Sequence, residues 1–523
     1  MTSRLKTIFF NYKFVFLLFL SLHIIFFNIN TAEWGDSYRI LRASEFVRKG
    51  AYPSDEKRPP LFSILLSIRP AAQDQIIWGR LFMFAVSVLF YFLFTKYARM
   101  YIKDNNYALL AVLYFIFNPI IFYWSLRIMA DAFFAFLALL ALYWLASWRD
   151  SVDFGRLFLL GFVSSLAVLT RFEGYLLFIS VIVGIYFGTE KISLSSLRIK
   201  NLWRKLKNSI LNILIYTITF IIVLSPYLIS KDPLKSSYFK EPLSRSYDFT
   251  NVWIYLVSLL FIFGSLFSFF FIYKKPRPFI SFFQRNISVA VFIVLELLLI
   301  LWWPAAIPRL FTCTIPFLII PLVLSIEAFV KKKENIRNKD LLILILLILI
   351  YSVSQYYLKL QFLIPVKISF IAIILLHILI IFLIKKGKYL LFNILIVISL
   401  FFWTVQTVIL HKDIYAAIKE AAEYSINNLE GVIASNDATY LYEWYLNYYS
   451  GNKEARSVYI GEKDIDGILK GGNIDYILVT NEDNISPRFS TSDRQDLYLI
   501  KDFRYNISGR EFYARIYKIM EIK

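Results

Sequence analysis

The chain has 523 residues, of which 58% are hydrophobic and 19% aromatic, and its formal net charge is +20. This composition is too apolar for a soluble protein of several domains, so the sequence predicts an α-helical polytopic membrane protein. The basic excess does not indicate nucleic-acid binding, because no basic cluster accompanies a nucleic-acid-binding motif. One cysteine, Cys313, and three dispersed histidines exclude a disulfide framework and a histidine-centred zinc site.

Hydrophobic runs long enough to cross about 30 Å of hydrocarbon recur along most of the chain. A longer run at 157–187 is interrupted by Thr170, Arg171 and Glu173, and this pattern predicts two short helices. With that pair, the sequence predicts thirteen spans. The other runs lie at roughly 9–27, 76–95, 108–124, 128–147, 210–229, 251–273, 287–303, 312–330, 341–357, 366–384 and 389–409.

Lys and Arg residues set the predicted orientation of these spans. With the N-terminus in the cytoplasm, basic clusters such as Lys96–Lys103 and Lys385–Lys388 lie inside, as the positive-inside rule requires. The external loop 28–75, the 230–250 loop and the chain after His411 then lie outside. We therefore expect a multi-pass protein of the cell membrane with an extracytoplasmic C-terminal domain, and generic contact between its inner face and membrane lipids.

A change to polar composition near residue 411 divides the chain into two predicted domains. Residues 1–410 form a transmembrane domain that includes the external loop 28–75, and residues 411–523 form a small soluble α/β domain. Strands alternate with helices in the second domain, which predicts a largely parallel sheet. Its predicted elements are helix Asp413–Leu429, strand Val432–Ser435, helix Ala438–Tyr449, strand Arg456–Ile460, helix Asp464–Lys470, and strands at Asp475–Thr480, Leu497–Ile500 and Phe512–Ile519.

The loop Trp34–Leu61 is predicted to hold an amphipathic helix. Ile40, Ala43 and Val47 share one helical stripe, and basic residues occupy the other face. Such a segment between two spans is expected to lie flat on the outer membrane surface. The pair Pro59-Pro60 ends the helix and redirects the chain.

Two acids at the outer face are candidates for chemistry. Asp36 immediately precedes the amphipathic helix. It fits a helix N-cap, but it also fits a general base or metal ligand placed where a soluble acceptor meets a membrane-embedded substrate. Asp131 lies near the outer end of a span, where an ionisable side chain is costly and usually functional. A simple ion pair with Arg127, one turn earlier, is the alternative for Asp131.

Three basic or acidic side chains at the same face accompany these acids. Arg171 and Glu173 fall at the outer turn between two short helices, and snorkelling to the interface is their alternative role. Arg309 lies among prolines such as Pro308, which indicates irregular backbone around a cavity. Acids can deprotonate an acceptor or bind a divalent ion, and arginines can bind phosphate bidentately. The set therefore suits transfer of a group from a phosphorylated lipid.

The first external loop resembles that of the GT-C glycosyltransferase superfamily. That superfamily includes protein O-mannosyltransferases, aminoarabinose transferases acting on lipid A and oligosaccharyltransferase catalytic subunits, although the oligosaccharyltransferase WWDYG sequence is absent here. The RIMAD segment and the LTRFEG turn are also similar. The loop residues that carry the likeness are Asp36, Tyr38, Ala43, Phe46, Gly50, Tyr52, Pro53 and Pro59-Pro60-Leu61.

The resemblance implies transfer of a sugar, as by a hexosyltransferase, from a polyprenyl (dolichyl) phosphate donor to a protein, glycan or lipid acceptor at the extracytoplasmic face. Asp36 would be the catalytic base, and Asp131 would orient the acceptor or assist Asp36. Arg171 and Arg309 would bind the donor phosphate. The remaining expected substrate-binding residues are Arg127, Glu173 and Tyr38.

Two questions stay open at this point. The sequence indicates no certain cofactor, and it leaves open whether a divalent cation, Mg²⁺ or Mn²⁺, takes part. The alternative function is a transporter or flippase of a lipid-linked or anionic substrate. Such proteins place ionisable groups near the bilayer midplane, often in repeated halves, whereas here the candidates gather at the outer face.

Overall fold

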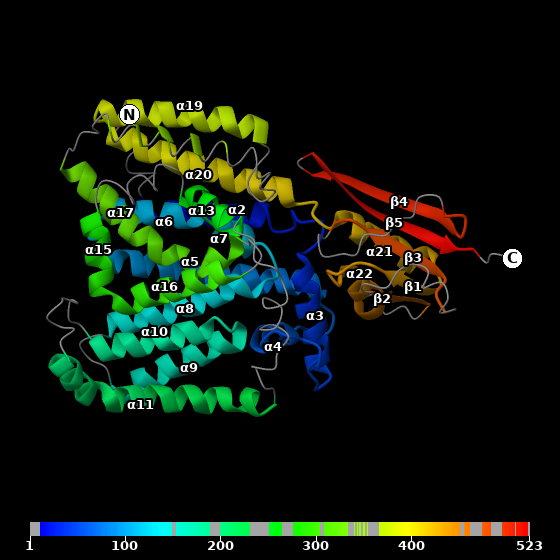
Figure 1. Ribbon diagram of the computed structural model, residues 1–523, viewed down its shortest axis with the longest axis horizontal. Helices are drawn as coiled ribbons and strands as arrows, with labels where there is room; N and C mark the ends of the chain where they lie inside the picture. Colours follow the sequence, from blue (N-terminus) through cyan, green and yellow to red (C-terminus); the bar gives the residue numbers. More distant parts are fainter. Residues whose placement is uncertain are drawn as a thin grey trace.

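The computed structural model describes residues 11–148, 153–188, 199–230, 250–263, 276–303, 308–332, scattered positions between 339 and 353, 366–449, 454–460, 473–482, 494–507 and 509–520. These residues form a bundle of long helices and, at one end of it, a small domain with a sheet (Figure 1). The predicted 230–250 loop and helix Asp464–Lys470 lie outside the described residues, as does most of the predicted span at 341–357.

The bundle consists of apolar helices that run side by side (Figure 1). Among the described residues, four helices are long and apolar enough to cross a membrane, or six if each bent pair is one span. The count of thirteen spans therefore stays a prediction. The helices of the bundle are α2 (Tyr12–Ile25), α5 (Gln75–Tyr101), α6 (Asn105–Ile116), α7 (Pro119–Ser125), α8 (Ala130–Ser147), α9 (Phe154–Thr170), α10 (Gly174–Phe187), α11 (Ile199–Ser230), α13 (Thr250–Phe263), α15 (Pro276–Arg285), α16 (Ile287–Trp302), α17 (Ile315–Lys331), α19 (Val366–Lys385) and α20 (Tyr389–His411).

Short polar side chains begin several of these helices. Asp74 and Asp104 each accept a hydrogen bond from a backbone N–H at the start of α5 and α6. Asn118 does the same for α7, and Pro119 cannot continue the preceding helix, so the chain bends by 55° between α6 and α7. The bend carries α7 into the wall of the cavity described below.

The predicted break in the apolar run at 157–187 is confirmed. Helix α9 ends at Thr170 and α10 begins at Gly174. A Cβ atom at Gly174 would lie only 2.3 Å from the backbone nitrogen of Val168, so the close approach of the two helices at this turn requires glycine. The turn exposes Arg171 to the cavity at the end of the bundle.

Two short helices, α3 (Gly35–Arg48) and α4 (Leu61–Ser67), lie between the bundle and the C-terminal domain (Figure 1). Helix α3 packs against α4 and against α22 (Leu441–Trp444) of that domain, and Tyr38 and Arg42 are buried. The apolar stripe of this amphipathic helix therefore faces protein rather than lipid, and its position flat on the outer membrane surface stays a prediction. Periodicity cannot distinguish a stripe covered by protein from one covered by lipid.

The C-terminal domain has a five-stranded sheet in the order β2-β1-β3-β5-β4. Strand β1 pairs in parallel with β2 and β3, whereas β5 pairs antiparallel with β3 and β4. The sheet is thus mixed rather than largely parallel, because β4 and β5 form a hairpin whose turn includes Gly509 at φ +80°. The domain's other elements and strand bounds are α21 (Ala416–Asn428), β1 (Gly431–Ser435), the π-helical turn η5 (Tyr445–Tyr449), β2 (Ala455–Tyr459), β3 (Tyr476–Thr480), β4 (Leu497–Ile507) and β5 (Arg510–Ile519).

The C-terminal domain rests directly on the segment between α2 and α5. The Thr31 hydroxyl donates a hydrogen bond to Asp413 at 2.8 Å. The Tyr38 ring lies 5.3 Å from that of Trp444, and a Cβ atom at Gly35 would lie 2.6 Å from the Thr439 Cβ. These contacts fix the start of α3 against both parts of the molecule.

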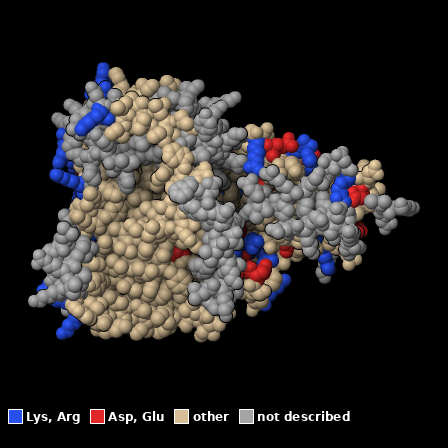
Figure 2. Space-filling view, in the orientation of Figure 1, with Lys and Arg blue, Asp and Glu red and all other residues tan. Residues whose placement is uncertain are grey.

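Charge is distributed unevenly along the long axis. In the face shown in Figure 2, Lys and Arg gather at the end of the bundle opposite the C-terminal domain, and the side of the bundle is almost entirely uncharged. This agrees with the pattern that the positive-inside rule requires if the C-terminal domain is extracytoplasmic. The orientation in the cell stays a prediction.

Candidate active site

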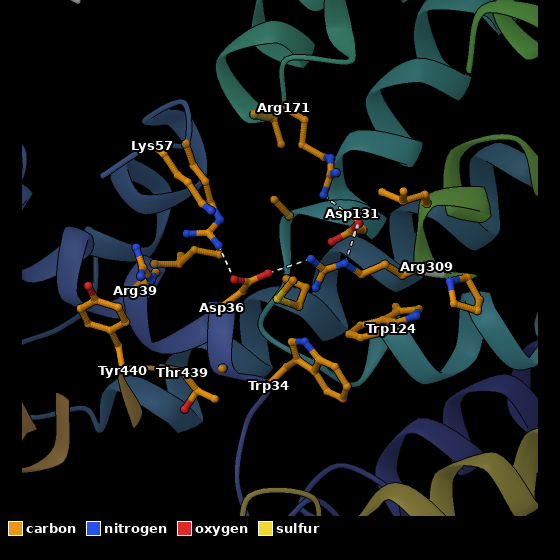
Figure 3. A pocket seen from close by; sticks show the side chains of 18 of the residues that line it. Trp34, Asp36, Arg39, Lys57, Trp124, Asp131, Arg171, Arg309, Thr439 and Tyr440 are labelled. Atoms are coloured by element: carbon orange, nitrogen blue, oxygen red, sulfur yellow. Dashed lines mark hydrogen bonds and ion pairs between the residues drawn. The ribbon is translucent and has the colours of Figure 1, made fainter. Parts of the chain in front are cut away.

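A cavity of about 430 Å³ lies where the bundle, α3 and the C-terminal domain meet (Figure 3). Segments distant in the sequence form its wall, among them α7, α8, the α9–α10 turn and the 3₁₀ helix η4 (Pro308–Cys313). The irregular backbone predicted around Arg309 is this 3₁₀ helix. The predicted site residues that line the cavity are Asp36, Asp131, Arg171, Glu173 and Arg309.

Two arginines hold the carboxylate of Asp36, which lies in the first turn of α3. One oxygen accepts a hydrogen bond from Arg58, and the other accepts one from Arg309 Nη2 at 2.7 Å. Burial favours a raised pKa, but the two guanidinium groups overcome this effect and hold the pKa of Asp36 well below its usual value. The N-cap interpretation is wrong, because Trp34 occupies that position and no side chain caps the helix.

The second acid, Asp131, lies in the first turn of α8 and pairs with Arg171. Arg171 Nη1 donates a hydrogen bond to Asp131 Oδ1 at 2.7 Å, and Arg171 Nε donates one to Glu173 at 3.1 Å. Both acids are buried. The alternative pair of Asp131 with Arg127 does not form, because Arg127 precedes the helix, which begins at Ala130, and points elsewhere.

Arg309 connects the two acids. Its Nη2 bonds to Asp36, its Nε lies 3.9 Å from Asp131 Oδ1, and its guanidinium lies 5.5 Å from the centre of the Trp124 ring. Within the described part of the chain, Arg309 Nη1 and Asp131 Oδ2 are buried without a hydrogen-bond partner. An unsatisfied buried polar group costs about 1–3 kcal/mol. A polar ligand in the cavity would remove that cost.

The charges around the cavity favour an anion. Arginines and acids alternate along the row Arg58, Asp36, Arg309, Asp131 and Arg171 (Figure 3). Basic side chains outnumber acidic ones in the lining, and a cavity with an excess of one sign of charge attracts the opposite sign. The lining bases are Arg39, Lys57, Arg58, Arg171 and Arg309, and the lining acids are Asp36, Asp131 and Glu173.

Two predicted substrate-binding residues do not line the cavity. Arg127 is fully buried, and its guanidinium donates hydrogen bonds to the carbonyl oxygens of Ala32 and His411. The Tyr38 hydroxyl accepts a hydrogen bond from the Glu33 backbone N–H, and its ring packs against the C-terminal domain. The structure places both residues where the chain segments around the cavity are joined, rather than at its surface.

No protein-family model matches the sequence, and no curated protein matches it. Solved structures do match the fold. ArnT from Cupriavidus metallidurans bound to undecaprenyl phosphate has a TM-score of 0.60 at 13% identity, with 95% of this chain and 97% of that chain covered. Its apo form gives a TM-score of 0.60 at 12% identity, with 96% and 97% covered.

A third match is the apo oligosaccharyltransferase of Archaeoglobus fulgidus, with a TM-score of 0.52 at 10% identity. The match covers 86% of this chain and 66% of that one. The chain shares the fold of ArnT and of the archaeal oligosaccharyltransferase. The predicted resemblance is thereby confirmed for the fold, and it extends over the C-terminal domain as well as the bundle.

Within this shared fold, sequence reasoning missed part of the cavity wall. Arg58 binds Asp36, and the only sequence signal for it is a basic pair directly before Pro59-Pro60. The C-terminal domain contributes Thr439, Tyr440 and Tyr459 to the lining. No local pattern distinguishes these three from other residues of a small α/β domain.

The acids of this site do not fit a divalent cation. Among the described residues, no group of three His, Cys, Asp or Glu side chains is arranged to hold a metal ion. Both oxygens of Asp36 already face guanidinium groups, and one oxygen of Asp131 does too. A cation there would be repelled by the same arginines.

Proposed function

We propose that this protein is a membrane glycosyltransferase that transfers a sugar from a polyprenyl-phosphate donor to an acceptor at the extracytoplasmic face. The observation that carries the proposal is the guanidinium of Arg309, which bonds to Asp36, lies beside Asp131 and has two buried nitrogens, Nε and Nη1, without a hydrogen-bond partner among the described residues. A phosphate bound there brings its sugar next to two carboxylates. The GT-C fold supports this function, as does the undecaprenyl phosphate bound by ArnT.

Arg309, Arg171 and Arg58 bind the donor phosphate. Guanidinium groups form paired, charge-assisted hydrogen bonds with phosphate oxygens, and they stabilise the negative charge that grows as the phosphate departs. The cavity lies at the ends of the membrane helices, where the phosphate of a lipid anchored in the bilayer is within reach (Figure 3). The net positive lining favours this charged group over a neutral lipid.

Asp36 is the base that deprotonates the acceptor hydroxyl. With Arg58 and Arg309 both bound, its lowered pKa makes it a weak base. A donor phosphate competes for the same guanidinium groups, and weaker pairing moves the pKa of Asp36 back toward its ordinary value. Donor binding thus prepares the base, so that Asp36 is most reactive when the donor is in place.

The transfer itself is a direct displacement. The acceptor oxygen bonds to the anomeric carbon, the bond from that carbon to the phosphate oxygen breaks, and the proton passes to Asp36. Asp131 assists Asp36 by positioning the guanidinium that the two acids share, because its Oδ1 lies 3.9 Å from Arg309 Nε. Arg171 holds Asp131 in place through its 2.7 Å hydrogen bond.

The test is turnover by the full-length protein in lipid nanodiscs, supplied with undecaprenyl-phosphate and dolichyl-phosphate sugars and an extract of source-cell glycans and lipids. Release of polyprenyl phosphate and a sugar-bearing product are measured by mass spectrometry. Asp36→Asn should lower turnover about 10²–10⁴-fold, the usual contribution of a general base. Arg48→Gln is the control, because Arg48 is exposed on the same helix and does not line the cavity.

Two outcomes contradict the proposal. Undiminished turnover of Asp36→Asn would remove Asp36 from the chemistry. Movement of the lipid across the nanodisc or a liposome membrane, without any covalent product, would favour the alternative of a transporter or flippase.

A further inference from the structure

The end of the cavity nearest the C-terminal domain contains a stacked arginine. Arg39 lies one turn after Asp36 on α3, and its guanidinium carbon is 3.7 Å from the centre of the Tyr440 ring. Both side chains line the cavity (Figure 3). A guanidinium held over an aromatic ring by a cation–π contact is less mobile than a free side chain, and its N–H groups stay available to a ligand.

The hydrogen-bonding capacity of Arg39 is unused within the described residues. Its neighbours on this face are paired: Arg42 bonds to Asp55, and Arg58 bonds to Asp36. Arg39 forms no hydrogen bond or ion pair with any residue that the structure describes, although Asp55 lies close enough to influence it electrostatically. Arg39 is thus a preorganised cation with free donors at the wall of a cavity.

Tyr440 holds its ring under Arg39 at a cost in backbone energy. Its φ is +64°, in the left-handed region that non-glycine residues seldom adopt, at a cost of about 1–2 kcal/mol. The Asp437 carboxylate maintains this turn by accepting hydrogen bonds from the backbone N–H groups of Thr439 and Tyr442, both at 2.9 Å. Because of this turn, the helix that was predicted to begin at Ala438 begins at Leu441 instead. Such strain is commonly kept where it positions a functional group.

Asp36 separates this arginine from the proposed donor site. In Figure 3, Arg39 and Tyr440 lie on one side of Asp36, and Arg309, Asp131 and Arg171 lie on the other. The donor phosphate is tethered to a membrane lipid and therefore takes the side built by the membrane helices. The side built by α3 and the C-terminal domain is left for the acceptor.

From these observations we infer that Arg39, stacked on Tyr440, binds an anionic group of the acceptor. The acceptor is accordingly a sugar or glycan that carries a phosphate or a carboxylate. A planar guanidinium with free donors binds either oxyanion bidentately. The inference rests on the proposed function, since that function makes this side of Asp36 the acceptor side.

The experiment measures binding by the full-length protein in nanodiscs. The acceptor-side probes are mannose 6-phosphate, glucuronic acid and mannose, and undecaprenyl phosphate probes the donor side. The wild type should bind at least one of the two anionic sugars, whichever matches its natural anion, and should bind mannose at least tenfold more weakly. Arg39→Gln should lower the affinity for the anionic sugar about 10–100-fold, the effect of losing a charge-assisted hydrogen-bonded pair.

Further variants separate the charge from the stacking. Arg39→Lys keeps the charge but loses the planar fork, so binding should fall less than in Arg39→Gln. Tyr440→Phe keeps the ring and should bind like the wild type. Tyr440→Asn tolerates the left-handed backbone but removes the ring, and should weaken binding about threefold to tenfold. Thermal unfolding of each variant confirms that it is folded.

The controls distinguish this inference from the proposed function. Arg48→Gln, an exposed arginine on the same helix, should bind all probes like the wild type. If Arg39→Gln weakens undecaprenyl phosphate as much as the anionic sugar, Arg39 belongs to the donor site and the inference is wrong. Failure of both anionic sugars to bind, or equal binding of mannose, also overturns it. If sugar binding depends on Arg39 but undecaprenyl phosphate does not bind at all, the proposed function is contradicted, whereas Arg39 is still supported as an anion-binding residue.

Discussion

Arg127 and Arg309 lie in the same end of the helical bundle, but their surroundings differ in kind. Arg127 is fully buried and donates hydrogen bonds to two backbone carbonyls. These bonds hold the segment after α2 and the end of α20 against the segment that precedes α8. Arg309 bonds to a carboxylate and faces a cavity. Each also has a buried N–H group without a partner among the described residues. An unused donor therefore indicates a ligand only where there is space for one.

The difference predicts that replacing Arg309 impairs catalysis more than folding. Arg309→Gln removes the charge that stabilises the departing phosphate, so kcat/KM should fall about 10²–10³-fold. Asp36 keeps its bond to Arg58, and thermal unfolding should shift only slightly. Steady-state turnover with a polyprenyl-phosphate sugar measures the first effect. Arg309→Lys, which keeps the charge without the fork, should recover part of the activity, and turnover within threefold of wild type in Arg309→Gln would contradict the assignment.

The converse holds for Arg127. Arg127→Gln leaves the carbonyls of Ala32 and His411 without their charged donor, so the free energy of unfolding should fall by about 2–3 kcal/mol. The activity of each folded molecule should stay within about threefold of wild type. Thermal unfolding in detergent, with turnover normalised to folded protein, separates the two quantities. A variant that is stable but inactive would place Arg127 in the chemistry after all.

These two arginines also show how far the sequence predicts the site. Ionisable residues at the ends of apolar runs correctly predicted that Asp36, Asp131, Arg171 and Arg309 meet at one face, because burying such groups in lipid is costly. The sequence could not separate Arg127 from this set. Its partners are backbone carbonyls, and every residue has a carbonyl.

The positions of helices were predicted better than the parts of the molecule that they contact. The break between α9 and α10 followed from polar residues and a glycine in an apolar run, and the structure has it. The amphipathic stripe of α3 was also real, but periodicity says only that one face is covered, not whether lipid or protein covers it. The contact of Arg39 with Tyr440 had no sequence signal, because the two residues lie in different domains.

Acid titration sharpens the contrast between paired and unpaired acids. The folded-state pKa of Asp36 lies below its unfolded value of about 3.9, so its ionisation stabilises the fold above about pH 4, and this stabilisation is lost as the pH falls further. The free energy of unfolding of Asp36→Asn at pH 7 should therefore be about 1–2 kcal/mol lower than that of wild type, and its unfolding temperature should be lower as well. The gap should start to narrow as the pH falls below about 4.

Glu443 provides a control of opposite sign. Burial raises its pKa, so its ionisation destabilises the fold at neutral pH. Glu443→Gln should be more stable than wild type at pH 8, and this gain should vanish as the pH falls through the raised pKa. Unfolding temperatures at pH 3.5 to 8 measure both variants. Parallel pH profiles of wild type and both variants would contradict the two assignments together.

The smallest expected effect is that of metal removal. Arg58 and Arg309 occupy both oxygens of Asp36, and a cation that replaced them would separate Asp36 from the groups proposed to bind the donor phosphate. Treatment of the nanodisc-embedded protein with EDTA should therefore change turnover by no more than about twofold, a difference of about 0.4 kcal/mol. Re-addition of Mg²⁺ or Mn²⁺ should have no further effect. A tenfold loss that Mn²⁺ restores would mean that the arginines leave Asp36 before catalysis and that the carboxylates then take a cation, which would reverse the order of events proposed for the donor and the base.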